Sequence, residues 1–148
     1  MKHSLLQALA ITLLAAAAAM AAFQLHPRAP ALHAVQEPLK ADEVGLKEIH
    51  EHWKDEVIWL DARPRDQFQQ EHIPDARLLN EQEFDVLLLE LLDDLQMTRK
   101  PVVIYCGGKK CEASRHVREK LLTLVPLDEC FILKGGWPVW KQAHPLVK

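Results

Sequence analysis

The sequence predicts an α/β domain in which helices cover both faces of a mostly parallel sheet. Two runs, VIWL at 57–60 and VVIY at 102–105, contain only apolar residues, as strands buried on both faces do. Segments with helical spacing of apolar and charged residues separate these runs from each other and from a third apolar run at 131–133. Strands that alternate with helices are typical of β–α–β units, whose strands run parallel.

The first half of the domain is expected to contain two helices and two strands. Residues 41–53 predict a helix because apolar residues recur among charged ones, although Gly45 weakens the pattern. The strand at 57–60 comes next, and a short helix is expected at 64–70. Residues 77–79 predict the second strand of this half.

The second half repeats the alternation with longer helices. Residues 83–95 are rich in leucine, with Asp and Glu on the opposite side, as in an amphipathic helix. The strand at 102–105 precedes a second amphipathic helix at 112–124. A strand at 131–133 then leads through two glycines into a last helix at 137–143.

Cys106 directly follows the strand at 102–105, at the edge where open parallel sheets bind ligands. The next four residues are two glycines and two lysines: Gly107, Gly108, Lys109 and Lys110. Glycines allow successive backbone N–H groups to turn inward, and the helix that follows directs its positive dipole end to the same place. Nearby cations and helix N-termini favour a thiolate over a thiol. The sequence therefore predicts a nucleophilic cysteine beside an anion-binding loop.

Residues 1–25 predict a segment that directs export. A basic residue, Lys2, precedes an uncharged run at 4–25, which fits a secretory signal peptide or an N-terminal membrane anchor. Its length and the lack of a polar region before a cleavage site favour the uncleaved anchor. The proline-containing residues 26–38 are expected to be a linker, and 39–148 the domain. The domain would then lie in the periplasm of a two-membrane bacterium, anchored in the inner membrane or secreted.

Composition argues against several other classes of function. The net charge is −3 and no basic stripe is present, so a nucleic-acid partner is not expected. His50 and His52 are two residues apart and point to different sides of a helix, and the other histidines are scattered. We therefore expect neither a metal site nor a cofactor.

Three blocks of the sequence together resemble the rhodanese-like domain family. These blocks are VIWLDARPRDQFQQEHIPDARLLN, PVVIYCGGKKCEAS and FILKGGWPVWKQA, in the order typical of that family. The resemblance implies a five-stranded, mostly parallel sheet and a sulfurtransferase. Cys106 would accept a sulfane sulfur from a small donor such as thiosulfate, hold it as a persulfide cradled by the loop, and pass it to a thiophilic acceptor.

The same resemblance implies roles for residues outside the loop. Asp61 and Arg63 match its Asp-x-Arg motif: Asp61 is expected to anchor loops, and Arg63 either to pair with Asp61 or to bind substrate. His72 matches a structural histidine. The closing motif, expected to be a packing device, comprises Gly135, Gly136, Trp137 and Trp140.

Cys111 departs from the family pattern and leaves alternatives open. The active-site loop either ends at Cys111 or is two residues longer, with Ser114 opening the helix. Cys111 could line the substrate loop, resolve the persulfide, or form a disulfide with Cys106. The alternatives to a sulfurtransferase are thus a thiol–disulfide redox or sensing protein and a non-catalytic interaction domain. Glu112 stands where related phosphatases carry an arginine, which argues against phosphatase chemistry.

Overall fold

The computed structural model describes residues 2–25, 38–108 and 112–145 and divides the chain into two units, Met1–Glu37 and Pro38–Lys148. Helix α1 (Lys2–Leu25) belongs to the first unit. Over the residues whose backbone and side chains the structure describes, no helix is both long and apolar enough to cross a membrane. The predicted linker lies outside the described residues except for Pro38. The export and localisation of this chain stay predictions.

The second unit is built on a five-stranded sheet in which all strands run parallel, so the predicted fold class is confirmed. The strand order is β1-β5-β4-β2-β3, which places β4 at the centre. The strands are β1 (Glu43–Val44), β2 (Ile58–Asp61), β3 (Arg77–Leu78), β4 (Val102–Tyr105) and β5 (Cys130–Leu133). All residues of β4 are buried, as its unbroken apolar sequence predicts.

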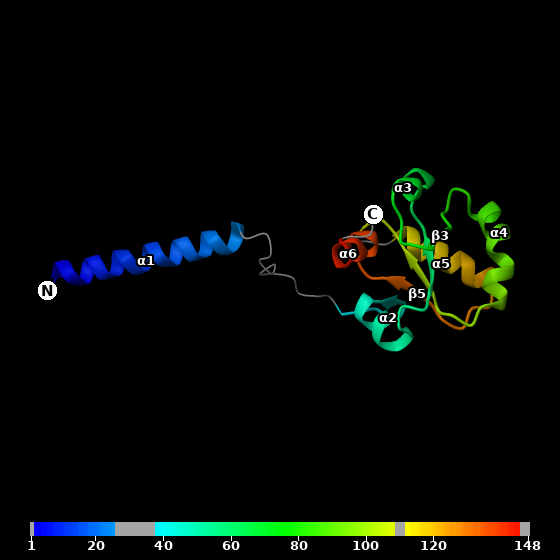
Figure 1. Ribbon diagram of the computed structural model, residues 1–148, viewed down its shortest axis with the longest axis horizontal. Helices are drawn as coiled ribbons and strands as arrows, with labels where there is room; N and C mark the ends of the chain where they lie inside the picture. The colour runs from blue at the N-terminus through cyan, green and yellow to red at the C-terminus, as the bar shows by residue number, and fades with distance from the viewer. Residues whose placement is uncertain (1, 26–37, 109–111, 146–148) are drawn as a thin grey trace. The chain divides into compact units, whose positions relative to one another are not determined.

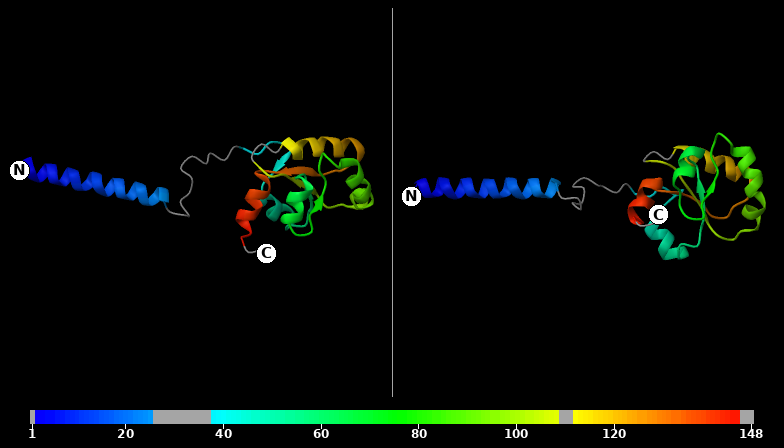
Figure 2. Two further views of the ribbon diagram at one scale, coloured as in Figure 1. Left: turned by 90° about the horizontal axis from the view of Figure 1, so that it is seen from above. Right: turned by 45° about the horizontal axis from the view of Figure 1, so that its top comes forward.

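Helices cover both faces of the sheet, as the views in Figures 1 and 2 show. The helices are α2 (Leu46–Trp53), α3 (Arg65–Gln70), α4 (Phe84–Met97), α5 (Glu112–Leu124) and α6 (Gly136–Ala143). Buried leucines of α4 and α5 pack on one face against β4 residues such as Ile104. Ile49 of α2 and Trp140 of α6 pack on the other face against Val103 and Tyr105. The alternation of β4 side chains between the two faces thus builds two cores.

The predicted helix at 41–53 is wrong over its first residues. Glu43 and Val44 instead form the edge strand β1, paired with Ile132 and Leu133 of β5. Gly45, in an extended conformation, separates this strand from α2. A two-residue strand has no periodicity of its own, so its pairing with β5 decides its structure.

Strand register places the two buried cysteines that the structure describes at opposite ends of the sheet. Asp61 pairs with Tyr105 at the carboxyl ends of β2 and β4, and Cys106 follows at once. Cys130 pairs with Val102 at the amino end of β4, roughly 13 Å of strand from Cys106. Cys106 therefore lies at the carboxyl edge, where open parallel sheets bind ligands, whereas Cys130 lies at the amino edge.

Candidate active site

Cys106 is nearly buried, with 5% of its surface exposed, at the point where β4 gives way to the loop. Its Sγ lies 3.5 Å from the carbonyl oxygen of Gly108, to which the thiol can donate a hydrogen bond. Cys106 forms a small buried cluster with Ile132 of β5, and Ala113 of α5 packs against this cluster. The first turn of α5 thus closes back on the cysteine that precedes the loop.

The first residues of α6 hold the backbone of Cys106 from the opposite side. The N–H of Trp137 donates to the carbonyl oxygen of Cys106 over 2.8 Å. Gly136 has a φ of 58°, and a Cβ there would collide with the same carbonyl oxygen. The Gly-Gly-Trp turn, expected only to pack, therefore contacts the backbone of the candidate nucleophile.

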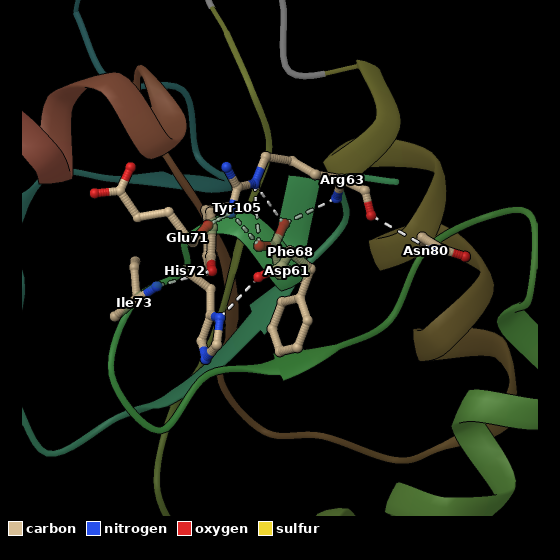
Figure 3. A network of polar contacts seen from close by, with 8 residues as sticks. All are labelled: Asp61, Arg63, Phe68, Glu71, His72, Ile73, Asn80 and Tyr105. Carbon is tan, nitrogen blue, oxygen red and sulfur yellow. Dashed lines mark hydrogen bonds and ion pairs between the residues drawn. The ribbon is translucent and has the colours of Figure 1, made fainter. Parts of the chain in front are cut away.

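Asp61 and Arg63 form a buried ion pair at the carboxyl end of β2 (Figure 3). Arg63 Nε lies 3.0 Å from each carboxylate oxygen of Asp61, and Nη2 lies 2.6 Å from Oδ2. The backbone N–H of Arg63 also donates to Asp61 Oδ1 over 2.9 Å. Burial acts to lower the pKa of Arg63, but the bonds and charge of Asp61 prevail and raise it. Of the two roles expected for Arg63, the ion pair with Asp61 is therefore present.

The Arg63 guanidinium also contacts the segment after α3 and the first turn of α6. Nη2 donates to the carbonyl oxygen of Glu71 over 2.7 Å, and the guanidinium carbon lies 4.6 Å from the Trp137 ring centroid. A Cβ on Gly107 would lie 3.7 Å from Arg63 Cδ. Arg63 thus lies beside the start of the active-site loop and connects it to α3 and α6; its binding of substrate stays a prediction.

Tyr105 and Asn80 complete this polar network, and sequence analysis did not single them out. The Tyr105 hydroxyl accepts a hydrogen bond from the Ile73 N–H over 3.2 Å. Burial, with the nearby Asp61 charge, raises the pKa of Tyr105. Asn80 donates through Nδ2 to the carbonyl oxygen of Arg63 at 3.4 Å (Figure 3). The available signal for Tyr105 was a hydroxyl at the end of a fully apolar strand, since a buried hydroxyl needs a partner.

His72 lies at the surface, where Nδ1 is 2.8 Å from the Phe68 carbonyl oxygen and the two rings stack at 4.1 Å. These contacts hold the end of α3. The predicted roles of Lys109, Lys110 and Cys111 fall outside the described residues and stay predictions.

Cys130 provides a contrast with Cys106. It is a free thiol, and burial raises its pKa from 9.0 to about 11 despite the nearby Arg118. A buried thiol with a high pKa is a poor nucleophile, which agrees with a role in the core.

The fold and site define a parallel α/β protein with a cysteine at the carboxyl end of its central strand, followed by a glycine-containing loop and a helix. The family model of the rhodanese-like domain matches residues 45–143. The chain belongs to this family.

Individual proteins are similar to this chain in sequence or in fold. Thiosulfate sulfurtransferase GlpE of Coxiella burnetii is 28% identical over 94 residues, which cover 62% of this chain and 78% of that protein. BH2092 of Bacillus halodurans superposes with a TM-score of 0.54 at 19% identity, over 69% of this chain and 72% of that one. The human single-domain sulfurtransferase TSTD1 superposes with a TM-score of 0.52 at 18% identity, over 70% of this chain and 97% of that one. These structures share the fold of this chain.

Proposed function

We propose that this chain is a rhodanese-type sulfurtransferase that carries sulfane sulfur as a persulfide on Cys106. The observation that supports it most directly is the placement of Cys106 at the carboxyl end of β4, with its carbonyl oxygen bonded to Trp137 N–H. The similarity to thiosulfate sulfurtransferase GlpE supports thiosulfate as the donor class.

The proposed reaction has two transfers. The Cys106 thiolate attacks the outer sulfur of thiosulfate, forming a new S–S bond while the bond between the two thiosulfate sulfurs breaks. Sulfite leaves with the electron pair. A thiophilic acceptor such as cyanide or a thiolate then attacks the terminal sulfur, and the electron pair of the broken S–S bond restores the Cys106 thiolate.

Several groups besides Cys106 have a part in this proposal. Loop N–H groups, the N-terminus of α5 and the side chains of Lys109 and Lys110 stabilise the anions. The Asp61–Arg63 pair holds the end of β2, and the α6 turn holds the end of β4, where the loop begins.

Intact-mass spectrometry before and after thiosulfate treatment tests the proposal. We expect the full chain to gain one sulfur atom, located on Cys106 by peptide mapping, and to lose it on addition of cyanide. A loss of two hydrogens with a linked Cys106–Cys111 peptide would favour the redox alternative. An unchanged mass in both states would favour a non-catalytic domain.

We further propose that residues 1–25 direct the domain to the periplasmic side of an inner membrane. The basic start and uncharged run of the sequence support this proposal. We expect full-length protein in the membrane fraction, with the domain open to protease added outside the inner membrane. A full-length protein found only in the cytosolic fraction would contradict it.

A further inference from the structure

Ser114 carries a buried hydroxyl that has no hydrogen-bond partner among the residues that the structure describes. The residue is 0% exposed. The other buried polar side chains of the described residues, those of Asp61, Arg63 and Asn80, all form hydrogen bonds. Leaving a buried hydroxyl without a partner costs stability, so Ser114 requires an explanation that the resting structure does not supply.

The position of Ser114 connects it to Cys106. It is the third residue of α5 and lies on the same helix face as Val117 and Leu121, which pack into the core beneath the helix. The helix N-terminus follows the loop that begins at Cys106, and the neighbouring Ala113 packs against the cluster formed by Cys106 and Ile132. The first turn of α5, which contains the buried Ser114, therefore lies beside the cluster that contains the candidate nucleophile.

The usual local partner is also missing for this hydroxyl. Serines inside helices often donate to the carbonyl oxygen four residues earlier. Ser114 is the third residue of α5, and its hydroxyl makes no such bond to a residue that the structure describes. Its hydroxyl is therefore available to an acceptor at the helix N-terminus, where the dipole favours negative charge.

We propose that the Ser114 hydroxyl donates a hydrogen bond to the sulfur that Cys106 carries. This inference rests on the proposed function, because the acceptor exists only in the persulfide state. A persulfide anion places one additional, negatively charged sulfur beside the first turn of α5, and a hydroxyl donor to an anion makes a charge-assisted bond. Ser114 thus has its partner in the loaded protein and lacks it in the resting protein.

The test compares wild type with Ser114→Ala in the full chain, loaded with thiosulfate and then freed of it. We expect the persulfide of the variant, followed by intact mass, to decay roughly ten-fold faster, the effect of losing a bond to a charged group. The resting variant should melt no lower than wild type, since the substitution removes an unpartnered hydroxyl.

A pH profile separates this role from a structural one. A donor to the persulfide anion lowers its pKa, so Ser114→Ala should move the midpoint pH of sulfur transfer to cyanide upward. Thr123→Ala is the matched control: it removes a hydroxyl from the same helix, where Thr123 donates to the backbone at an exposed position. The persulfide of Thr123→Ala should decay at the wild-type rate, and its midpoint pH for sulfur transfer to cyanide should equal that of wild type.

The outcomes distinguish two kinds of failure. A wild type that takes up no sulfur from thiosulfate overturns the proposed function, and this inference with it. A loaded wild type and a loaded Ser114→Ala variant with equal decay rates and equal midpoints overturn the inference alone. A resting Ser114→Ala variant that melts well below wild type also overturns it, since the hydroxyl would then serve the resting fold.

Discussion

The two ends of the central sheet carry cysteines of nearly equal burial but different surroundings. Cys106, 5% exposed, lies at the carboxyl end beside a glycine-containing loop and the N-terminus of α5. Cys130, 4% exposed, lies at the amino end of β5 in the core beneath α5. Burial alone therefore does not distinguish a candidate nucleophile from a core thiol. The strand end, the loop and the helix dipole make the difference.

The largest expected effect is the loss of activity when the Cys106 thiol is removed. Cys106→Ser should abolish sulfur transfer from thiosulfate to cyanide, because a hydroxyl cannot carry a persulfide at neutral pH. Cys130→Ser is the matched control at the other end of the sheet and should keep most of the activity of the folded protein. Substantial turnover by Cys106→Ser would show that Cys106 is not the nucleophile, and the functional difference between Cys106 and Cys130 would be lost.

Removing Arg63 should produce the largest loss of stability. Arg63→Ala leaves Asp61 buried without its partner, which typically costs about 3–5 kcal/mol of unfolding free energy. Urea denaturation of wild type and variant measures this difference. Arg65→Ala is the control, since Arg65 forms a similar pair with Glu83 at the surface, and we expect little change there. Equal losses for the two variants would show that burial of the Arg63 pair is unimportant.

Gly136→Ala tests whether the α6 turn supports Cys106. The alanine methyl would collide with the Cys106 carbonyl oxygen and would require a left-handed conformation. We expect a loss of about 2 kcal/mol and a fall in turnover of the remaining folded protein. Gly45→Ala is a suitable control, because a Cβ there meets only the end of the flexible Glu48 side chain. A Gly136→Ala protein with normal stability and turnover would contradict a supporting role.

Sequence patterns predicted the parts of this site whose structure is set by residues close together in the chain. The strand 102–105 and the helix 112–124 agree with the observed β4 and α5, so the position of Cys106 followed from the sequence. The contact between Gly136 and Cys106 did not follow, because it depends on how α6 packs after 29 intervening residues. Strand β1 was missed for the same reason: its two residues become a strand only through pairing with β5.

The raised pKa of Cys130 predicts a loss of stability at alkaline pH. Because the folded protein holds this proton more tightly, the contribution is complete below pH 9.0 and is lost as the pH rises through about 11. Cys130→Ala should remove a decline on the order of 2 kcal/mol over this interval. Urea denaturation of both proteins between these pH values measures it. Tyr105, whose pKa is also raised, adds the same decline to both proteins. Parallel curves for the two proteins would mean that the thiolate of Cys130 is not disfavoured by folding.

The smallest expected effect concerns Asp75, which lies in a cavity wall beside the start of β2, at the amino end of the sheet. Its φ of 62° is a left-handed conformation that glycine adopts without strain. Asp75→Gly should therefore be more stable than Asp75→Ala by about 1 kcal/mol, as measured by thermal or urea denaturation. Because this turn is far from the Cys106 end, both variants should transfer sulfur at the wild-type rate once folded. A loss of turnover in either variant as large as that of Gly136→Ala would contradict this prediction. It would show that a change at the amino end of the sheet affects the activity of Cys106 at the carboxyl end.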